Sequence, residues 1–197
     1  MLPVFITNHL DSWVLYAAYI IWLLPEFIAS FTDRMSSNAK VSDGASHVVI
    51  FVSIWLAIYA GYWSAFVVRP LAIPWHRTLL FAVGIFLMLA GVAFRWYSIR
   101  VLGKYFTRQV AIQPGQTVVE NGPYRLIRHP SYSGALLTIF GLGLAFTNWL
   151  SLIGVVTLAF VGYSYRVWVE EKTLVNALGE PYRQYMKRTK RFIPFVY

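Results

Sequence analysis

Long apolar segments separated by short polar ones dominate the chain. Segments long enough to cross a bilayer, which takes about 20 residues, predict membrane-spanning helices near residues 11–31, 46–68, 78–99, 131–147 and 149–167. Only Asn148 separates the last two, and so short a connection fits only an antiparallel helical hairpin. The pattern therefore predicts an all-α fold, a polytopic integral membrane bundle of about five transmembrane helices.

The composition agrees with a membrane protein. Hydrophobic residues make up 58% of the chain and charged residues 13%, whereas a soluble domain carries about 25% charged residues. The chain lacks cysteine, which excludes disulfides, thiolate nucleophiles and cysteine-bound metal clusters. Its four histidines show no metal-ligand spacing, so we expect no metal site.

The distribution of positive charge predicts an orientation. Of the 17 Lys and Arg residues, only Arg69 and Arg77 fall on the side of the predicted spans opposite the C-terminus. Because cytoplasmic segments carry the excess of Lys and Arg, we expect a cytoplasmic C-terminus, in a bacterial inner membrane or the endoplasmic reticulum depending on the source. This explains the net charge of +9 without a nucleic-acid partner.

The segment of residues 101–130 interrupts the hydrophobic pattern. It has two β-compatible runs, 109–112 and 117–119, a turn between them at Pro114 and Gly115, and a second turn at Asn121, Gly122 and Pro123. This punctuation predicts an ordered cytoplasmic segment that acts as a lid or as half of a site against the membrane face. An ordered connecting loop without a ligand is the alternative.

A proline marks the start of the fourth predicted helix. Pro130 suits the first helical position, where the N–H that proline lacks is not needed. The positive end of this helix would face the cytoplasm beside Arg125, Arg128 and His129, which favours an anionic group such as a carboxylate or phosphate. Contact with anionic lipid headgroups is the alternative.

Further charged residues lie where predicted spans leave the membrane. Arg166 and Glu170 are four residues apart and share one helix face, with Glu171 next to them. They form either an ordinary surface ion pair or ligand contacts. Glu26, near the inner end of the first span, is expected to be structural. The basic and aromatic tail, residues 179–195, suits a helix lying on anionic headgroups.

Two motifs together resemble the isoprenylcysteine carboxyl methyltransferase family: GPYRLIRHPSYSG at 122–134 and RVWVEEKTLVNALGEPYRQY at 166–185. The resemblance covers residues 109–194. It implies an integral membrane enzyme that uses S-adenosyl-L-methionine, releases S-adenosyl-L-homocysteine and methylates the carboxylate of an isoprenylated cysteine, or a similar lipophilic acceptor that enters from the bilayer among the membrane lipids. Trp168 and Val169 stand where eukaryotic members carry a longer acidic run, a departure that concerns the substrate more than the cofactor.

The resemblance also implies roles for individual residues. The cofactor pocket would be formed by Gln109, Gln116, Thr117, Val118, Val119, Tyr124, His129, Pro130, Ser131, Tyr132 and Glu170. Arg166 would be the catalytic residue, near the reacting carboxylate. A donor with a sulfonium and an ammonium calls for a carboxylate such as Glu170, and aromatic faces suit the adenine or the sulfonium. Residues 1–197 would form a single domain, with three N-terminal spans in 1–100 and the catalytic part in 101–197.

Two other functions compete with this one. A phospholipid N-methyltransferase would use the same cofactor on the amine of phosphatidylethanolamine, but an amine acceptor would gain nothing from Arg166. A non-enzymatic scaffold or small transporter is the second alternative. A transporter would be expected to carry polar residues near the bilayer midplane, and Glu26 is the only candidate.

Overall fold

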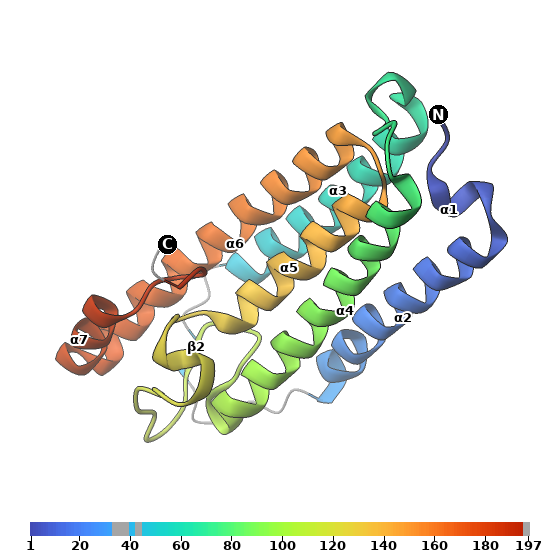
Figure 1. Ribbon diagram of the computed structural model, residues 1–197. Helices are drawn as coiled ribbons and strands as arrows, with labels where there is room; N and C mark the ends of the chain where they lie inside the picture. The colour runs from blue at the N-terminus through green and yellow to red at the C-terminus, as the bar shows by residue number, and fades with distance from the viewer. Residues whose placement is uncertain (33–39, 42–44, 195–197) are drawn as a thin grey trace.

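The computed structural model of the protein describes residues 1–32, 40–41 and 45–194. Within these residues, five long helices form most of the structure (Figure 1): α2 (His9–Thr32), α3 (Ser46–Val67), α4 (Arg77–Leu102), α5 (Pro130–Ala145) and α6 (Trp149–Leu178). The shorter elements are the helices α1 (Val4–Thr7) and α7 (Glu180–Arg188), the 3₁₀ turns η1 (Arg69–Leu71), η2 (Gly103–Tyr105) and η3 (Gly122–Arg125), and the strands β1 (Lys40–Val41) and β2 (Ala111–Ile112).

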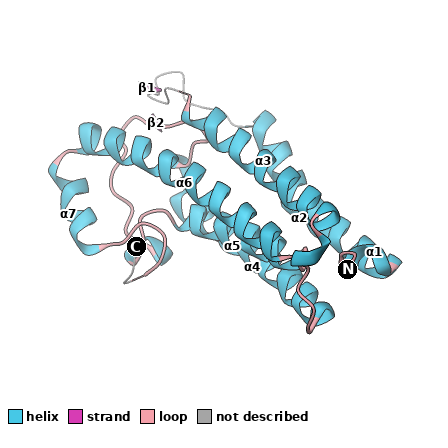
Figure 2. Ribbon diagram, turned by 90° about the horizontal axis from the view of Figure 1, so that it is seen from above, coloured by secondary structure: helices cyan, strands magenta, loops and turns pink. Residues whose placement is uncertain are grey.

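The long helices form one bundle. Helix α5 packs between α4 and α6, while α3 packs on α6 and α2 packs on α4 (Figures 1 and 2). The predicted hairpin of the last two spans is present: Asn148 caps α6 by accepting hydrogen bonds from the Leu150 N–H at 2.9 Å and the Ser151 N–H at 3.2 Å. One end of the bundle is formed by the segment after α4, the start of α5, α7 and the described C-terminal residues (Figure 1). Helix α1 lies at the other end.

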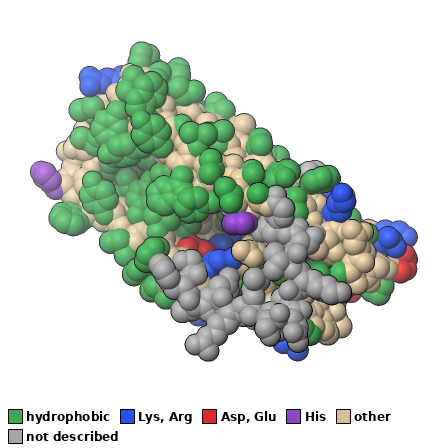
Figure 3. All heavy atoms as spheres, turned by 180° about the vertical axis from the view of Figure 1, so that it is seen from behind, with side chains coloured by type: hydrophobic (Ala, Val, Ile, Leu, Met, Phe, Trp, Pro, Cys, Tyr) green, Lys and Arg blue, Asp and Glu red, His purple; other side chains and the backbone are tan. Residues whose placement is uncertain are grey.

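The fold confirms the prediction of an all-helical integral membrane protein. Helices α2, α3, α4 and α6 are long and apolar enough to cross a membrane. Much of the surface seen in Figure 3 consists of hydrophobic side chains. The exposed large hydrophobic residues of these helices include Phe27, Tyr59 and Phe86. Such an extended apolar surface is typical of contact with lipid rather than water.

The fifth predicted span corresponds to α5, whose length differs from that of the others. It has 16 residues, about 24 Å of helix, against a hydrocarbon core of about 30 Å. Most of its residues are buried between α4 and α6, so a short helix is accommodated without exposing its ends to lipid. The count of five spans stays a prediction.

Helix α6 continues further than its hydrophobic pattern indicates. The expected span stops at Val167, whereas the helix ends at Leu178. Residues 168–178 include no proline or glycine that would stop it, and Gly179, with φ at +65°, is the first residue that does. The extension carries Glu170 and Glu171 on a rigid helix beyond the apolar part.

Only one of the two predicted β-compatible runs forms a strand. The first run contains β2, but residues 117–119 form no strand. The partner of β2 is instead β1, antiparallel, with Lys40 opposite Ile112. The turn at Gly115, where φ is +68°, is present.

Glycines allow α4 and α5 to pack closely. A Cβ atom added at Gly91 would lie 2.5 Å from the Thr138 nitrogen and 2.6 Å from the Gly134 oxygen, both main-chain atoms of α5. Contacts that short require the two helix backbones to separate. Small residues at an interface are the usual means of close helix packing in membranes.

We therefore expect Gly91→Ala to lower the free energy of unfolding by about 2 kcal/mol through overpacking. The matched control is Gly154→Ala in α6, where an added Cβ meets nothing within 4 Å and better helix propensity predicts a neutral or slightly stabilising effect. Thermal unfolding of both variants in the same detergent tests the difference, and equal melting temperatures would contradict the proposed close packing.

Candidate functional site

A cavity lies at the bundle end where residues 101–130 meet α6 and α7. It is bounded by the segment after α4, by η3, by the first turn of α5 and by the extended end of α6. Its space is about 780 Å³, including the part open to solvent. No residue before Leu102 lines it among those that the structure describes.

The cavity gathers nearly all the residues that the resemblance implies. Its lining includes Gln109, Gln116, Thr117, Val118, Val119, Tyr124, His129, Ser131, Tyr132, Arg166 and Glu170. Pro130 does not line it; this residue is buried at the first position of α5 and shapes the start of that helix. Leu174, Leu178, Tyr182 and Tyr185 also line the cavity, and the sequence patterns did not indicate them.

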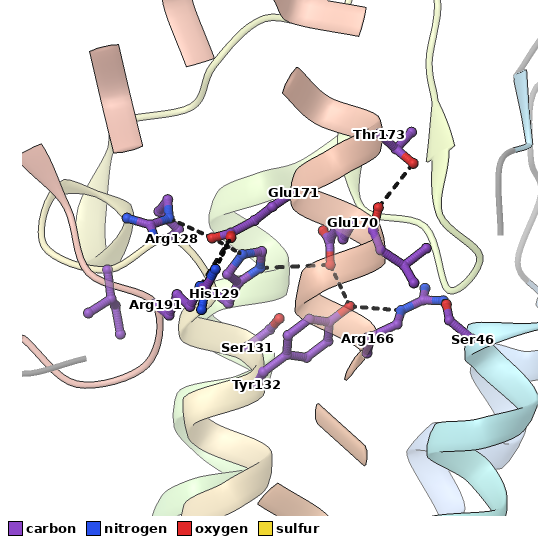
Figure 4. A network of polar contacts seen from close by, with 12 residues as sticks. Ser46, Arg128, His129, Ser131, Tyr132, Arg166, Glu170, Glu171, Thr173 and Arg191 are labelled. Carbon is purple, nitrogen blue, oxygen red and sulfur yellow. Dashed lines mark hydrogen bonds and ion pairs between the residues drawn. The ribbon is translucent and has the colours of Figure 1, made fainter. Parts of the chain in front are cut away.

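The hydroxyl of Tyr132 joins the two charged residues of α6 (Figure 4). It donates a hydrogen bond to Glu170 Oε2 at 2.8 Å and accepts one from Arg166 Nε at 3.3 Å. Arg166 is 3% exposed, so the interpretation of an ordinary surface ion pair is wrong. The structure instead places a buried guanidinium and a partly exposed carboxylate around one tyrosine at the cavity wall.

Other parts of the chain hold the Arg166 guanidinium in place. Its Nη1 donates to Ser46 Oγ, at the start of α3, at 2.6 Å, and its Nη2 donates to the main-chain carbonyl of Arg108. These contacts come from a different helix and from the loop after α4. They fix the plane of the guanidinium, which determines where a carboxylate could bind it.

His129 packs against the same group of residues. Its ring stacks on Tyr132, with ring centroids 5.6 Å apart and planes within 8°. Its Nδ1 lies 3.7 Å from Glu170 Oε2, and its Nε2 lies 3.4 Å from Glu171 Oε1. The imidazole is 4% exposed and contacts Tyr132 and both glutamates where it lines the cavity.

Three residues from different segments form what we call the clamp at the start of α5: Arg128, Glu171 of α6 and Arg191 of the tail. Glu171 accepts hydrogen bonds from Arg128 Nε at 2.8 Å and from Arg191 Nη2 at 2.9 Å. The tail also pairs with residues 126–129 through its main chain: the Arg128 N–H donates to the Lys190 carbonyl at 2.7 Å. Arg128 is therefore bound within the protein, although it lines the cavity with His129, whereas Arg125 is exposed and outside the lining. The expected anion site at the start of α5 stays a prediction.

The tail is also more closely packed than expected. Tyr182 and Tyr185 of α7 are buried, and the Tyr185 hydroxyl donates to the Tyr124 carbonyl at 2.7 Å. Burial raises the pKa of Tyr124 and Tyr182, and the carboxylate of Glu170 raises both further. These phenols therefore stay neutral around pH 7 and present rings and hydroxyl groups to the cavity.

We expect Arg191→Gln to lower the free energy of unfolding by about 2 kcal/mol, because it removes charge-assisted hydrogen bonds to a buried carboxylate. Arg188→Gln is the matched control: Arg188 pairs with Glu120 at 3.0 Å, but both side chains are exposed, at 61% and 42%, and such pairs contribute little. Thermal unfolding in detergent distinguishes the two. An equal loss of stability in both variants would show that the clamp contributes no more than the exposed pair.

The donor set of the cavity suits a small ligand with both cationic and anionic groups. Glu170 provides a carboxylate, Gln109 and Gln116 provide amides, and Tyr124 and Tyr132 provide aromatic rings. Among the described residues, no group of three or more His, Asp or Glu side chains could hold a metal ion. The fold and the site thus define an integral membrane protein with a cavity at one end of its helix bundle.

Comparison with known proteins finds similarity to one family of membrane enzymes. Residues 82–176 match the family model for isoprenylcysteine carboxyl methyltransferases. A probable protein-S-isoprenylcysteine O-methyltransferase of Oryza sativa subsp. indica is 25% identical over 190 residues, which are 94% of this chain and 97% of the relative. These matches support a relationship of the chain to the isoprenylcysteine carboxyl methyltransferase family.

Two further proteins are similar to parts of this chain. The cobalt-zinc-cadmium resistance protein CzcN of Cupriavidus metallidurans is 34% identical over 122 residues, which cover 61% of this chain and 51% of that protein. A solved structure of the eukaryotic intramembrane Ras methyltransferase ICMT shares the fold with a TM-score of 0.57 and 24% identity, covering 78% of this chain and 53% of that one. The chain spans about half the length of these two proteins.

Proposed function

We propose that the protein transfers a methyl group from S-adenosylmethionine to the carboxylate of an isoprenylated cysteine or a similar lipophilic acid. Similarity to the isoprenylcysteine carboxyl methyltransferase family supports methyl transfer, and the names of several relatives include this substrate. The observation that carries the proposal is the buried Arg166 guanidinium beside Glu170 in one cavity, joined through Tyr132. Such a site can bind a carboxylate and a cationic donor next to each other.

The cavity residues fit the methyl donor in charge and shape. Glu170 would hold the cationic groups, the rings of Tyr124 and Tyr132 would contact the adenine or the sulfonium, and Gln109, Gln116 and residues 117–119 would complete the pocket. When bound, the cofactor supplies an electrophilic methyl group on a positively charged sulfur. The alternation of acidic, amide and aromatic groups in the lining supports this assignment.

The chain's own residues need to do little beyond binding and alignment. A carboxylic acid acceptor is ionised at pH 7, so the reaction needs no general base and no covalent enzyme intermediate. Arg166 would bind the acceptor carboxylate and orient one oxygen toward the donor. Alignment of two reactants can contribute on the order of 7–11 kcal/mol to catalysis, and the contacts of Arg166 with Ser46 and Arg108 favour a fixed orientation.

The location of the cavity suits two ligands of opposite solubility. The cavity lies where apolar helices meet the polar bundle end, so a lipid-tailed acceptor would enter from the bilayer and the cofactor from the aqueous side. The excess of Lys and Arg at this end favours a cytoplasmic location for it and for the C-terminus. In this proposal residues 1–197 act as one unit, with residues 101–197 as the catalytic part.

A labelled-methyl transfer assay tests the function. The protein, reconstituted in nanodiscs and shown to be folded, is offered N-acetyl-farnesylcysteine, a fatty acid and phosphatidylethanolamine side by side. We expect base-labile label, as a methyl ester, on the farnesylcysteine. Base-stable label on phosphatidylethanolamine would favour the N-methyltransferase alternative, and no transfer together with no cofactor binding would favour a non-enzymatic protein.

A further inference from the structure

A carboxylate outside the cavity is connected to it by two routes. Glu26, near the end of α2, accepts a hydrogen bond from Arg95 Nε at 2.6 Å and pairs with Arg108 Nη2 at 3.4 Å. The three side chains are 23%, 13% and 24% exposed, respectively. Acidic and basic side chains are visible next to one another at the border of the apolar face (Figure 3).

The first route leads to Arg166. The side chain of Arg108 pairs with Glu26, and the main-chain carbonyl of the same residue accepts a hydrogen bond from the Arg166 guanidinium. Arg108 lies in the irregular segment between η2 and β2, where no helix fixes its backbone. Its ion pair with Glu26 therefore helps to determine where that carbonyl, and hence Arg166, lies.

The second route leads to the start of α5. Arg95, the other partner of Glu26, donates from Nη1 to the Ser131 carbonyl at 3.3 Å. Ser131 lines the cavity and precedes Tyr132, whose hydroxyl bonds to Arg166 and Glu170. Both routes therefore end at the same three side chains.

A simple tether between helices would not need this arrangement. Arg95 alone would attach α2 to α4, whereas Arg108 belongs to a loop rather than to a helix of the bundle. Desolvating a carboxylate at a membrane boundary is costly, and such residues are usually retained for a role beyond stability. The second partner is the feature that points to the site.

We propose that Glu26 is a positioning residue for acceptor binding: through the Arg108 backbone it holds the Arg166 guanidinium in the orientation that receives the acceptor carboxylate. This inference rests on the proposed function. It assigns Glu26 no contact with substrate or cofactor. Instead, it connects the N-terminal half of the chain to a cavity that the C-terminal half lines.

The test combines binding and kinetics for Glu26→Gln, Arg108→Gln and the control Asp11→Asn, which changes a carboxylate in the first turn of α2. Arg108→Gln removes the ion pair but keeps the carbonyl and leaves Arg95 paired, so it answers the possibility that Glu26→Gln fails to fold. Calorimetry measures the Kd of N-acetyl-farnesylcysteine with S-adenosylhomocysteine present, and the Kd of S-adenosylhomocysteine alone. The transfer assay gives kcat and KM.

We expect both variants to lower kcat/KM for the acceptor by about 10- to 100-fold, mainly through KM, with the Kd of S-adenosylhomocysteine within about threefold of wild type. The effect of Glu26→Gln should shrink in an Arg166→Lys background, because both changes act on the same group. Unchanged acceptor binding, or equal loss of cofactor and acceptor affinity, would overturn the inference.

The two proposals fail in different ways. A wild-type protein that binds the acceptor but transfers no methyl group would refute the proposed function, while the binding data would still decide the role of Glu26. A wild-type protein that binds no acceptor at all would refute both.

Discussion

Replacing Arg166 by Ala is expected to lower kcat/KM for carboxylate methylation by about 100- to 1,000-fold, the usual cost of losing a positioned donor at a reacting oxygen. The guanidinium is buried and held by Ser46, Tyr132 and the Arg108 carbonyl. No neighbouring cation on the same helix face can take its place. Methylation of an amine acceptor, if any occurs, should fall far less. The transfer assay with N-acetyl-farnesylcysteine and phosphatidylethanolamine measures both rates.

A second substitution separates charge from geometry at this position. Arg166→Lys keeps the positive charge but loses the planar fork that can bind both oxygens of a carboxylate, so we expect an intermediate loss. Activity of Arg166→Ala on the prenylcysteine acceptor equal to that of wild type would refute the role of Arg166 as the acceptor-binding residue.

Glu170→Gln is expected to weaken binding of S-adenosylhomocysteine or S-adenosylmethionine by about 30-fold or more, because a neutral amide cannot balance the cationic groups of the ligand. Gln keeps a hydrogen-bond acceptor for the Tyr132 hydroxyl, so the fold around it should persist. Calorimetric titration in nanodiscs measures the affinity.

The matched control for this prediction is Glu120→Gln. Glu120 is half exposed, pairs with Arg188 on the surface and does not line the cavity, so its loss should leave the affinity within about twofold of wild type. Wild-type affinity in Glu170→Gln would place the cationic groups of the ligand elsewhere in the protein.

The helices were predictable because their cause is local. Apolar runs of membrane-spanning length begin and end within three residues of the ends of α3 and α4, and Asn148 caps α6 at the expected hairpin. The end of α6 was not predictable from hydropathy, because a helix continues wherever nothing breaks it, and the break at Gly179 lies beyond the apolar residues.

The site was predictable to the extent that its residues lie in two contiguous motifs. Residues 122–134 and 166–185 indicated most of the side chains around Tyr132 and Glu170. The clamp of Arg128, Glu171 and Arg191 was missed because it joins three distant segments, although the adjacent pair Glu170 and Glu171 was a signal for it. Glu26 was expected to be structural, and its contact with Arg108 is the feature that points to a positioning role.

The pairing of β1 with β2 was equally hidden. It joins two residues of the short polar segment after α2 to two residues of the segment after α4. Neither strand is long enough to show an alternating pattern, so only the three-dimensional arrangement reveals the contact.

Hydrogen–deuterium exchange with and without S-adenosylhomocysteine is the most direct test of where the methyl donor sits. Bound ligand should slow exchange in three separate stretches at one end of the bundle: 109–119, 122–132 and 166–174. Slowing confined to α2 and α3, or none at a ligand concentration that saturates binding, would contradict this account.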